Sequence, residues 1–144
     1  MPTRSSTAVW TGGFKTGKGE FTGTNGLNGT YTAASRFESP GSDGLNPEDL
    51  MAAAEASCYS MALSVALEKN GTPPTSIETT AHCTVERVDG AQRITTMKIE
   101  TRARVPNIDE ETFQKIAQAT RDGCPVSKAI KGNVDLQLDA TLAR

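Results

Sequence analysis

Three cysteines and one histidine are the residues of this sequence whose types could carry thiol or metal chemistry. Cys58 lies inside a long apolar stretch, His82 and Cys83 are neighbours in an alternating stretch, and Cys124 directly precedes a proline. A cysteine can act as a nucleophile or redox centre, and both residue types can bind zinc. The number of cysteines is odd and no CxxC pair occurs, so the pattern predicts no disulfide framework.

Cys58 has two interpretations. It is a small residue among alanines, where it would allow close helix packing. Its neighbours Ser57, Tyr59 and Ser60 interrupt the apolar face, however, which favours a pocket and a reacting thiol. The helix dipole gives little help to a thiol in the middle of a helix, so a thiolate at Cys58 would require a nearby cation.

Cys124 also has two interpretations. It stands before Pro125, at the start of a predicted short helix whose free N–H groups could stabilise a thiolate. Alternatively, it is a tolerated small residue at an ordinary N-cap. The sequence leaves open whether Cys58 and Cys124 meet. If they do, one thiol can attack an oxidant and the other can resolve the product.

The remaining candidates are weaker. The period of the strand places Cys83 between Ala81 and Val85 on an inward face, which predicts a buried structural thiol. His82 then points outward, which leaves no Cys-His dyad of the kind that hydrolases use. A zinc site built from Cys58, Cys83, Cys124 and His82 is a further alternative, which we disfavour because no two of these residues show a spacing specific to zinc ligands.

The stretch from Asn46 to Gly71 must position Cys58, and it is predicted to form one long capped helix. Asn46 is a candidate N-cap and Pro47 takes the first helical position, while Asn70-Gly71 marks the end. Residues 61–67 are apolar on nearly every side. A helix of this kind needs cover on all sides, so we expect a dimer or a higher oligomer.

The other elements are read from turns and periodicity. Residues 8–37 break into three short strands at the turns Gly12-Gly13, Asn25-Gly26 and Asn28-Gly29, with the third strand over 31–37. The segment 39–46 is a connector. Strands are then predicted at 77–88, 93–105 and 134–142, with a turn at Asp89-Gly90. In the strand 93–105 the alternation predicts that Met97, Ile99, Ala103 and Val105 face inward. Helices are predicted from Asp109 to Gly123 and over 124–130. The result is a single α+β domain over residues 1–144, with antiparallel sheets packed on long apolar helices.

The composition excludes several classes of function. The formal net charge of -2, with both signs interspersed, provides no basic face for nucleic acid. The N-terminus has no apolar leader, and the run from Ala56 to Leu67 is shorter than the roughly 20 residues that span a bilayer. We therefore expect a cytoplasmic protein that does not act at a membrane.

Several motifs resemble one known family, the peroxiredoxin-like OsmC/Ohr proteins. They are Ser35-Arg36-Phe37-Glu38, Asn46-Pro47-Glu48-Asp49-Leu50, Ala56-Ser57-Cys58-Tyr59-Ser60-Met61-Ala62-Leu63, Pro74-Thr75-Ser76-Ile77 and Gly123-Cys124-Pro125-Val126-Ser127. Their order and spacing agree over most of the chain. A glycine precedes Cys124 where the Ohr branch has Val-Cys-Pro, which favours the OsmC branch.

The resemblance implies an intertwined homodimer with active sites at the subunit interface. It implies a thiol-dependent peroxidase of oxidative or osmotic stress defence that reduces organic hydroperoxides and is recycled by an external dithiol. It implies no metal and no organic cofactor. Cys58 would be the peroxidatic cysteine, Cys124 the resolving cysteine, Arg36 the cation and Glu48 its carboxylate partner. The alternative is a non-enzymatic redox-sensing or binding protein that uses the same reversible disulfide.

One geometric question follows from these roles. Glu48 and Cys58 are ten residues apart, or about 15 Å along an unbroken helix. Arg36 could not easily join them across that length. Either the helix breaks between Glu48 and Cys58, or Glu48 serves the thiol of the other subunit, which is the alternative we prefer.

Overall fold

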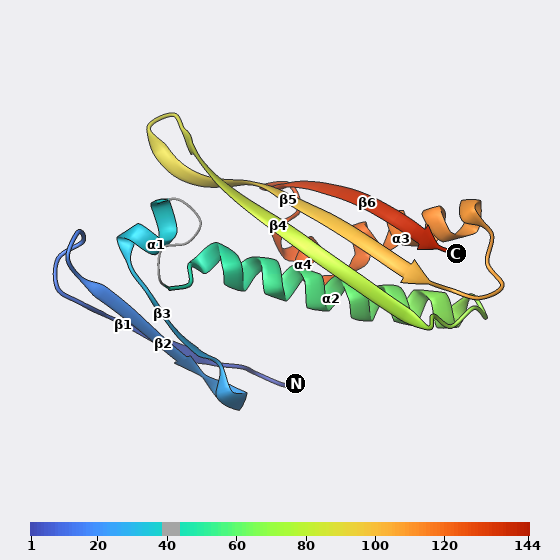
Figure 1. Ribbon diagram of the computed structural model, residues 1–144, viewed down its shortest axis with the longest axis horizontal. Helices are drawn as coiled ribbons and strands as arrows, with labels where there is room; N and C mark the ends of the chain where they lie inside the picture. Colours follow the sequence, from blue (N-terminus) through green and yellow to red (C-terminus); the bar gives the residue numbers. More distant parts are fainter. Residues whose placement is uncertain (39–43) are drawn as a thin grey trace. The chain divides into compact units, whose positions relative to one another are not determined.

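The computed structural model describes residues 1–38 and 44–144, which form two compact units, Met1–Asp49 and Leu50–Arg144. The boundary falls in the first turn of helix α2 (Pro47–Lys69), which is drawn in green in Figure 1. The connector expected over 39–46 lies largely outside the described residues. That the whole chain acts as one domain stays a prediction.

The first unit contains a three-stranded antiparallel sheet in the order β1 (Ser6–Thr11), β2 (Lys18–Gly23), β3 (Asn28–Tyr31). A 3-10 turn over Thr24–Gly26 joins β2 to β3, and the predicted turn at Asn25-Gly26 is confirmed because both residues have positive φ. The ring of Tyr31 lies opposite Gly19, where a Cβ would approach the ring to within 2.5 Å of Cε1. Glycine is therefore required at position 19 for the aromatic side chain to cover the strand.

The prediction of a strand over 31–37 is wrong. β3 ends at Tyr31, and Ala33–Phe37 forms a short helix, α1. Thr32 caps this helix: its Oγ1 accepts from the Ser35 N–H, and Ser35 Oγ accepts from the Thr32 N–H. The hydrogen bonds made by the Thr32 and Ser35 side chains outweigh the weak strand signal and place Arg36 on a helix. The predicted turn at Asn28-Gly29 is also wrong, since Gly29 lies within β3 opposite Phe21.

Helix α2 has the predicted ends. Asn46 Oδ1 accepts from the Asp49 N–H at 2.8 Å, and Asp49 Oδ2 accepts from the Asn46 N–H at 2.9 Å, which is a reciprocal cap. At the other end Gly71 has φ 82°, and the N–H groups of Gly71 and Thr72 bond back to the carbonyls of Glu68 and Leu67. This is the Schellman arrangement that glycine favours.

The second unit is built on a sheet in the order β4 (Ser76–Val88), β5 (Ala91–Arg104), β6 (Asp135–Ala143). β4 and β5 form the predicted hairpin through Asp89-Gly90, where both residues have positive φ. Of the β5 residues predicted to face inward, Met97, Ile99 and Ala103 are all buried.

The predicted α+β class and the antiparallel pairing hold for β1–β3 and for β4–β5, but β6 departs from the prediction because it pairs with β5 in parallel. The chain leaves β5, passes through α3 (Glu110–Gly123) and α4 (Pro125–Ile130), and returns to run beside β5 in the same direction. A parallel pair needs a crossover of about a dozen residues or more, which the two helices supply. The alternation of β6 alone could not distinguish the two directions.

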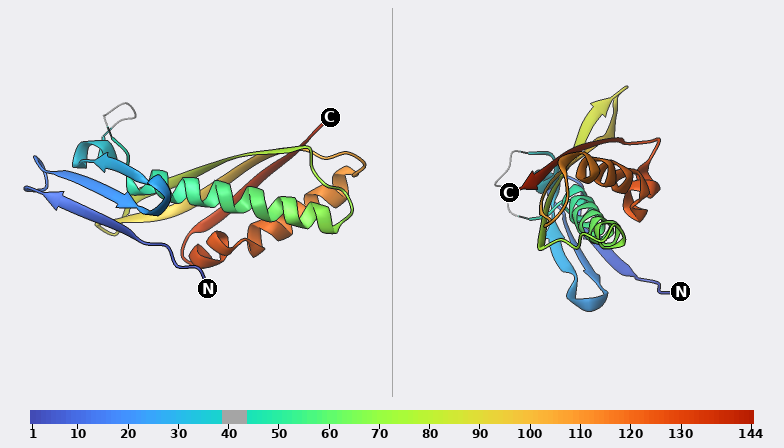
Figure 2. Two further views of the ribbon diagram at one scale, coloured as in Figure 1. Left: turned by 90° about the horizontal axis from the view of Figure 1, so that it is seen from below. Right: turned by 90° about the vertical axis from the view of Figure 1, so that its right-hand side faces the viewer.

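Helices α2 and α3 lie along the same face of the β4–β5–β6 sheet (Figures 1 and 2). The core between them is a single apolar cluster formed by Tyr59, Leu63, Leu67, Ile99, Ala103, Val105, Ile108, Phe113 and Leu142. By length and composition α2 could also cross a membrane. Its buried residues nevertheless pack on the sheet, as in the core helix of a folded domain.

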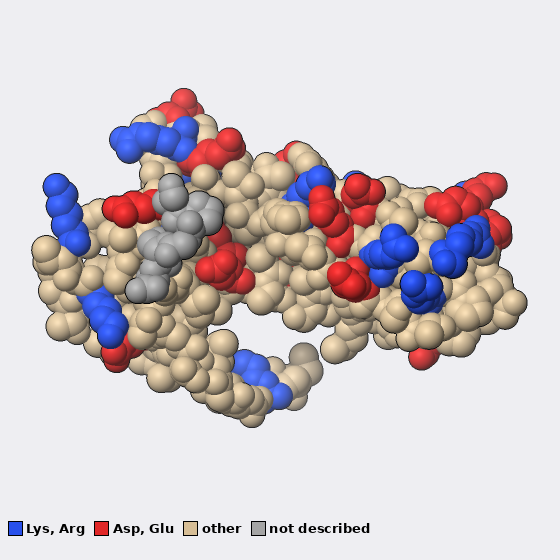
Figure 3. All heavy atoms as spheres, viewed as in Figure 1, with Lys and Arg blue, Asp and Glu red and all other residues tan. Residues whose placement is uncertain are grey.

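Surface charge is mixed in sign. On the face that Figure 3 shows, Lys and Arg side chains alternate with Asp and Glu side chains. This arrangement agrees with the small net charge of -2.

Candidate functional site

Cys58 and Cys124 lie side by side, which the sequence could not decide. Cys58 is half-buried in the middle of α2, and Cys124 stands between α3 and α4 with only 1% of its surface exposed. Their Sγ atoms are 3.1 Å apart, and neither cysteine is in a disulfide. Since an S–S bond is about 2.05 Å long, a shift of about 1 Å would join the two sulfurs.

The surroundings of Cys58 hold its thiol in the neutral form. Burial raises the pKa of Cys58, and the nearby Cys124 and Glu55 raise it further, whereas the backbone N–H of Val126 lowers it. Val126 lies in the first turn of α4, the helix expected to stabilise a thiolate at Cys124. The N–H group at this end therefore serves Cys58, while the Cys124 side chain makes no capping hydrogen bond.

Glu55 and Ser127 complete this cluster, and sequence reasoning missed both. Each is fully buried. Glu55 Oε1 accepts hydrogen bonds from Ser127 Oγ at 2.6 Å and from Cys124 Sγ at 3.6 Å. The available signal was the spacing of Glu55 and Cys58, because residues three apart share one face of a helix, and Glu55 is a lone carboxylate among alanines there.

The neighbours of Cys58 that suggested a pocket are instead satisfied by the fold. Tyr59 is buried and its hydroxyl donates to the carbonyl of Ala117 at 3.1 Å. Ser60 Oγ donates to Thr79 Oγ1 on β4 at 2.8 Å. The hydroxyl groups therefore tie α2 to α3 and to the sheet, on either side of the thiol.

Arg36 and Glu48 form an ion pair within the first unit. Arg36 Nη2 is 2.8 Å from Glu48 Oε1, and the Glu48 side chain is almost fully buried. The Ser35 hydroxyl donates to the Leu45 carbonyl at 2.8 Å and so joins α1 to the segment that leads into α2. Arg36 Nε and Glu48 Oε2 are buried without a hydrogen-bond partner among the described residues.

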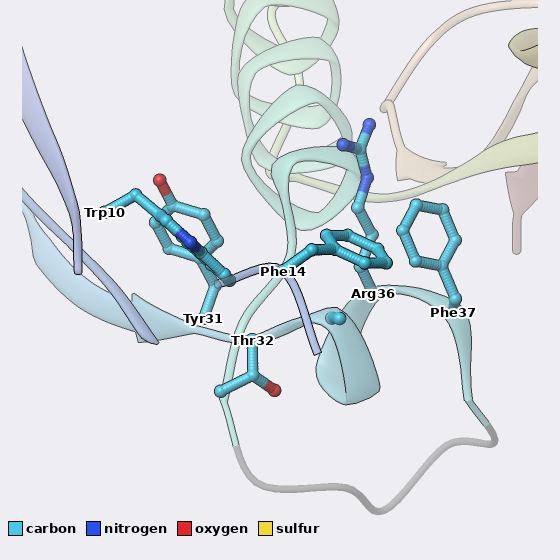
Figure 4. A pocket seen from close by; sticks show the side chains of 7 residues that line it. Trp10, Phe14, Tyr31, Thr32, Arg36 and Phe37 are labelled. Atoms are coloured by element: carbon cyan, nitrogen blue, oxygen red, sulfur yellow. The ribbon is translucent and has the colours of Figure 1, made fainter. Parts of the chain in front are cut away.

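The same arginine lines an aromatic pocket of about 340 Å³ in the first unit (Figure 4). Its walls are Trp10, Phe14, Tyr31, Thr32, Ala33, Arg36 and Phe37. Figure 4 shows the Arg36 side chain beside the rings of Phe14 and Phe37, and its Cζ lies 5.2 Å from the centre of the Phe37 ring. A pocket with apolar walls and one cation suits an apolar molecule with a polar end.

The predicted orientations of His82 and Cys83 are confirmed. His82 is exposed and its Nε2 lies 3.3 Å from Glu100 Oε2, while Cys83 is half-buried on the opposite face of β4. Within residues 1–38 and 44–144 no group of three or more His, Cys, Asp or Glu side chains could hold a metal. That Cys83 has a purely structural role stays a prediction.

Two of the four predicted site residues meet in each unit: Arg36 with Glu48, and Cys58 with Cys124. Helix α2 runs without a break from Pro47 to Lys69. A break between Glu48 and Cys58, the first of the two alternatives, is therefore ruled out. The other alternative, that Glu48 serves the other subunit's thiol, stays a prediction.

Comparison with known proteins identifies the family. The family model described as OsmC-like protein matches residues 40–139. The chain is 42% identical over 131 residues to the peroxiredoxin OsmC of Escherichia coli, with 90% of each chain covered. It is 37% identical over 101 residues to the organic hydroperoxide resistance protein OhrB of Bacillus subtilis, covering 69% of this chain and 71% of that protein.

A solved structure agrees with these matches. The crystal structure of Bacillus subtilis OhrB superposes with a TM-score of 0.71 and 26% identity, covering 95% of this chain and 98% of that one. The OsmC relative matches more of this chain, and at higher identity, than the OhrB relative, as the glycine before Cys124 predicted. The chain therefore belongs to the OsmC-like family.

Proposed function

We propose that this protein is a cysteine-based peroxidase that reduces organic hydroperoxides to alcohols. The observation that carries the proposal is the pair of thiols, Cys58 and Cys124, held 3.1 Å apart in a buried cluster. The names of the relatives, a peroxiredoxin and organic hydroperoxide resistance proteins, support the same chemistry.

The reaction has three steps. The Cys58 thiolate attacks the distal oxygen of the hydroperoxide and breaks the O–O bond; the alkoxide takes up a proton and leaves as the alcohol, and Cys58 becomes a sulfenic acid. Cys124 then attacks the Cys58 sulfur, forming a disulfide and releasing water. An external dithiol reduces the disulfide and restores both thiols. No metal or organic cofactor takes part.

Arg36 and Glu48 supply the charge that the thiols lack. Burial and the acidic neighbour raise the pKa of Cys58, so a cation is required to form the thiolate at neutral pH. Among the described residues Arg36 Nε has no acceptor, and a thiolate or a peroxide oxygen would satisfy it. We propose that the Arg36–Glu48 pair of one subunit acts on Cys58 of the partner subunit in an intertwined homodimer.

Exposed apolar residues support the dimer. In the first unit Val9 on β1, Phe14 in the β1–β2 connection and Leu27 just before β3 are exposed, and β1 has no buried residue. On α2, Met61 is 71% and Val65 46% exposed, although both lie on a helix that forms the core. Patches of this kind are commonly covered by a partner, and a second copy of the chain would provide the cover.

The test compares Cys58→Ser with Cys124→Ser in the presence of an alkyl hydroperoxide and a dithiol. We expect Cys58→Ser to lose all turnover with the dithiol. Cys124→Ser, mixed with hydroperoxide before the dithiol is added, should consume about one equivalent per site and stop, because its sulfenic acid has no resolving thiol. Peroxide consumption and free thiols are measured together. Full turnover by Cys58→Ser would refute the assignment.

The same experiment tests the alternative function. A redox-sensing protein would form the Cys58–Cys124 disulfide from oxidant but would not turn over hydroperoxide with a dithiol.

We place the peroxidase in the cytoplasm, in defence against oxidative or osmotic stress, because a reducing compartment would return the disulfide to thiols.

A further inference from the structure

Glu55 is a buried carboxylate that the proposed reaction has not yet used. It is fully buried, and its Oε2 has no hydrogen-bond partner among the described residues. None of the ion pairs found in residues 1–38 and 44–144 includes it. A buried carboxylate without a cation costs stability. The burial of Glu55 beside the two thiols therefore indicates a functional role for this carboxylate.

We propose that Glu55 is the catalytic base of the resolving step, which takes the proton of the Cys124 thiol as Cys124 attacks the Cys58 sulfenic acid. The inference rests on the proposed peroxidase function and assigns a residue to its second step.

The geometry limits where the Cys124 proton can go. Cys124 has one S–H, and two acceptors face it: Cys58 Sγ at 3.1 Å and Glu55 Oε1 at 3.6 Å. Once Cys58 is a sulfenic acid, its sulfur is the electrophile of the step and the proton must move elsewhere. Because Cys124 is only 1% exposed, bulk water cannot readily accept the proton, and the carboxylate is the group at hand.

Ser127 holds the carboxylate in place for this transfer. Its hydroxyl donates to Glu55 Oε1 at 2.6 Å, a length typical of a hydrogen bond to a charged oxygen. Ser127 and Cys124 are both supplied by the start of α4, so the thiol and the group that orients its base are carried together. The second oxygen, Oε2, has no hydrogen-bond partner in the described part of the chain and can hold a proton.

The step balances with Glu55 as a relay. The Cys124 proton passes to Glu55 as the Cys124–Cys58 bond forms, and the S–OH bond of Cys58 breaks with its electron pair on oxygen. The leaving hydroxide takes a proton from Glu55 and departs as water. The Cys124 sulfur is oxidised, the Cys58 sulfur is reduced from sulfenic acid to disulfide, and Glu55 returns to its starting form.

The other ionisable groups around Glu55 cannot act as the base that accepts the Cys124 proton. Tyr59 is neutral, since burial raises its pKa, and its hydroxyl is committed to the Ala117 carbonyl. Arg121 on α3 also influences Tyr59, but arginine is not a base. Cys58 is the reaction partner itself. Glu55 is thus the one carboxylate in hydrogen-bond contact with Cys124 in the described part of the chain.

The test separates the two steps in a single turnover. Reduced protein, freed of dithiol, is mixed with one equivalent of an alkyl hydroperoxide. A sulfenic-acid trap followed by mass spectrometry reports the first step, the oxidation of Cys58. The appearance of the Cys58–Cys124 disulfide reports the second. The variants are Glu55→Gln, Glu55→Asp and Ser127→Ala. Glu111→Gln, an exposed Glu on α3, is the matched control.

Loss of a general base typically slows a step by 10²–10⁴-fold. We therefore expect Glu55→Gln to form the sulfenic acid at the wild-type rate or faster, because Glu55 raises the pKa of Cys58. The same variant should form the disulfide about 10²-fold more slowly or worse. The long-lived sulfenic acid would be over-oxidised by excess hydroperoxide. Raising the pH should accelerate disulfide formation more in Glu55→Gln than in the wild type, because solvent hydroxide replaces the base.

A merely structural role predicts different results. Gln keeps the shape of Glu and the bond from Ser127, so a structural Glu55 would leave Glu55→Gln near wild type, whereas Glu55→Asp would be impaired. Disulfide formation by Glu55→Gln within about threefold of the wild type, well below the loss expected for a base, would overturn the proposal. If Glu55→Gln does not fold, Ser127→Ala, which frees the carboxylate, must slow disulfide formation and spare the first step.

A peroxide-free assay distinguishes failure of this proposal from failure of the proposed function. In the reaction with an aromatic disulfide such as Ellman's reagent, Cys58 forms a mixed disulfide, and Cys124 then displaces the aromatic thiol. That displacement also requires loss of the Cys124 proton. A wild type that does not react with hydroperoxide would refute the peroxidase function. Slow displacement of the aromatic thiol confined to Glu55→Gln would still support Glu55 as the base. Equal displacement rates in Glu55→Gln and the wild type would overturn the assignment of Glu55.

Discussion

Replacing Arg36 by Met tests the proposed source of the charge at Cys58. Within its own unit Cys58 is surrounded by a thiol and a carboxylate, and burial is the largest cause of its raised pKa. Among residues 1–38 and 44–144, the only group found to lower the pKa of Cys58 is one backbone N–H, that of Val126. If Arg36 supplies the missing cation, Arg36→Met should raise the pKa of Cys58 further above neutral.

The magnitude follows from the electrostatics. A cation within hydrogen-bond distance lowers the pKa of an acidic group by about 1–3 units. Below the pKa, each unit changes the thiolate fraction tenfold, so at neutral pH Arg36→Met should react about 10- to 10³-fold more slowly with hydroperoxide. Because the missing cation raises the pKa, the rate should recover as the pH increases, and the pH profile should move to higher pH by the same number of units.

The assay measures Cys58 alone. In a Cys124→Ser background, the rates of alkylation and of hydroperoxide reduction are followed from pH 5 to 10, and the Cys58 product is identified by mass spectrometry. Glu48→Gln keeps the Arg36 charge but removes its 2.8 Å anchor, so an intermediate shift is expected. Arg87→Met, at an exposed position of β4, is the control.

Two results would contradict the reasoning. Superimposable alkylation profiles for Arg36→Met and its parent would show that Arg36 does not charge the thiol. A loss of peroxide reduction with an unchanged alkylation profile would limit Arg36 to binding the peroxide.

Two further predictions concern α2. Burial raises the pKa of Tyr59, so the folded state retains the phenol proton. Above pH ~10 the free energy of unfolding of the wild type should therefore fall by about 1.4 kcal/mol per pH unit relative to Tyr59→Phe. Urea-unfolding free energies of the two proteins that change in parallel from pH 9 to 11 would contradict this. Met61→Glu with Val65→Glu places charges on the exposed face of α2, and sedimentation should show a dimer in the wild type and a monomer in the variant. A wild-type protein that sediments as a monomer would contradict the proposed homodimer.

Local signals were sufficient where a structure is made by neighbours in the chain. The N-caps of Asn46 and Asp109 and the turn at Asp89-Gly90 appear as predicted. Each depends on hydrogen bonds or φ angles within a few residues. Local reading failed at residues 31–37, where the Thr32 cap produces a helix in a stretch interpreted as a strand.

The sequence by itself therefore determined the helices around the thiols, the inward face of β5 and the family to which the motifs belong. Only the tertiary structure decided that β6 runs parallel to β5, that Cys58 meets Cys124, and that Glu55 touches Cys124. The physical reason is that these contacts join residues far apart in the chain. Their distances are set by how the α3–α4 crossover packs against α2, which no local pattern encodes.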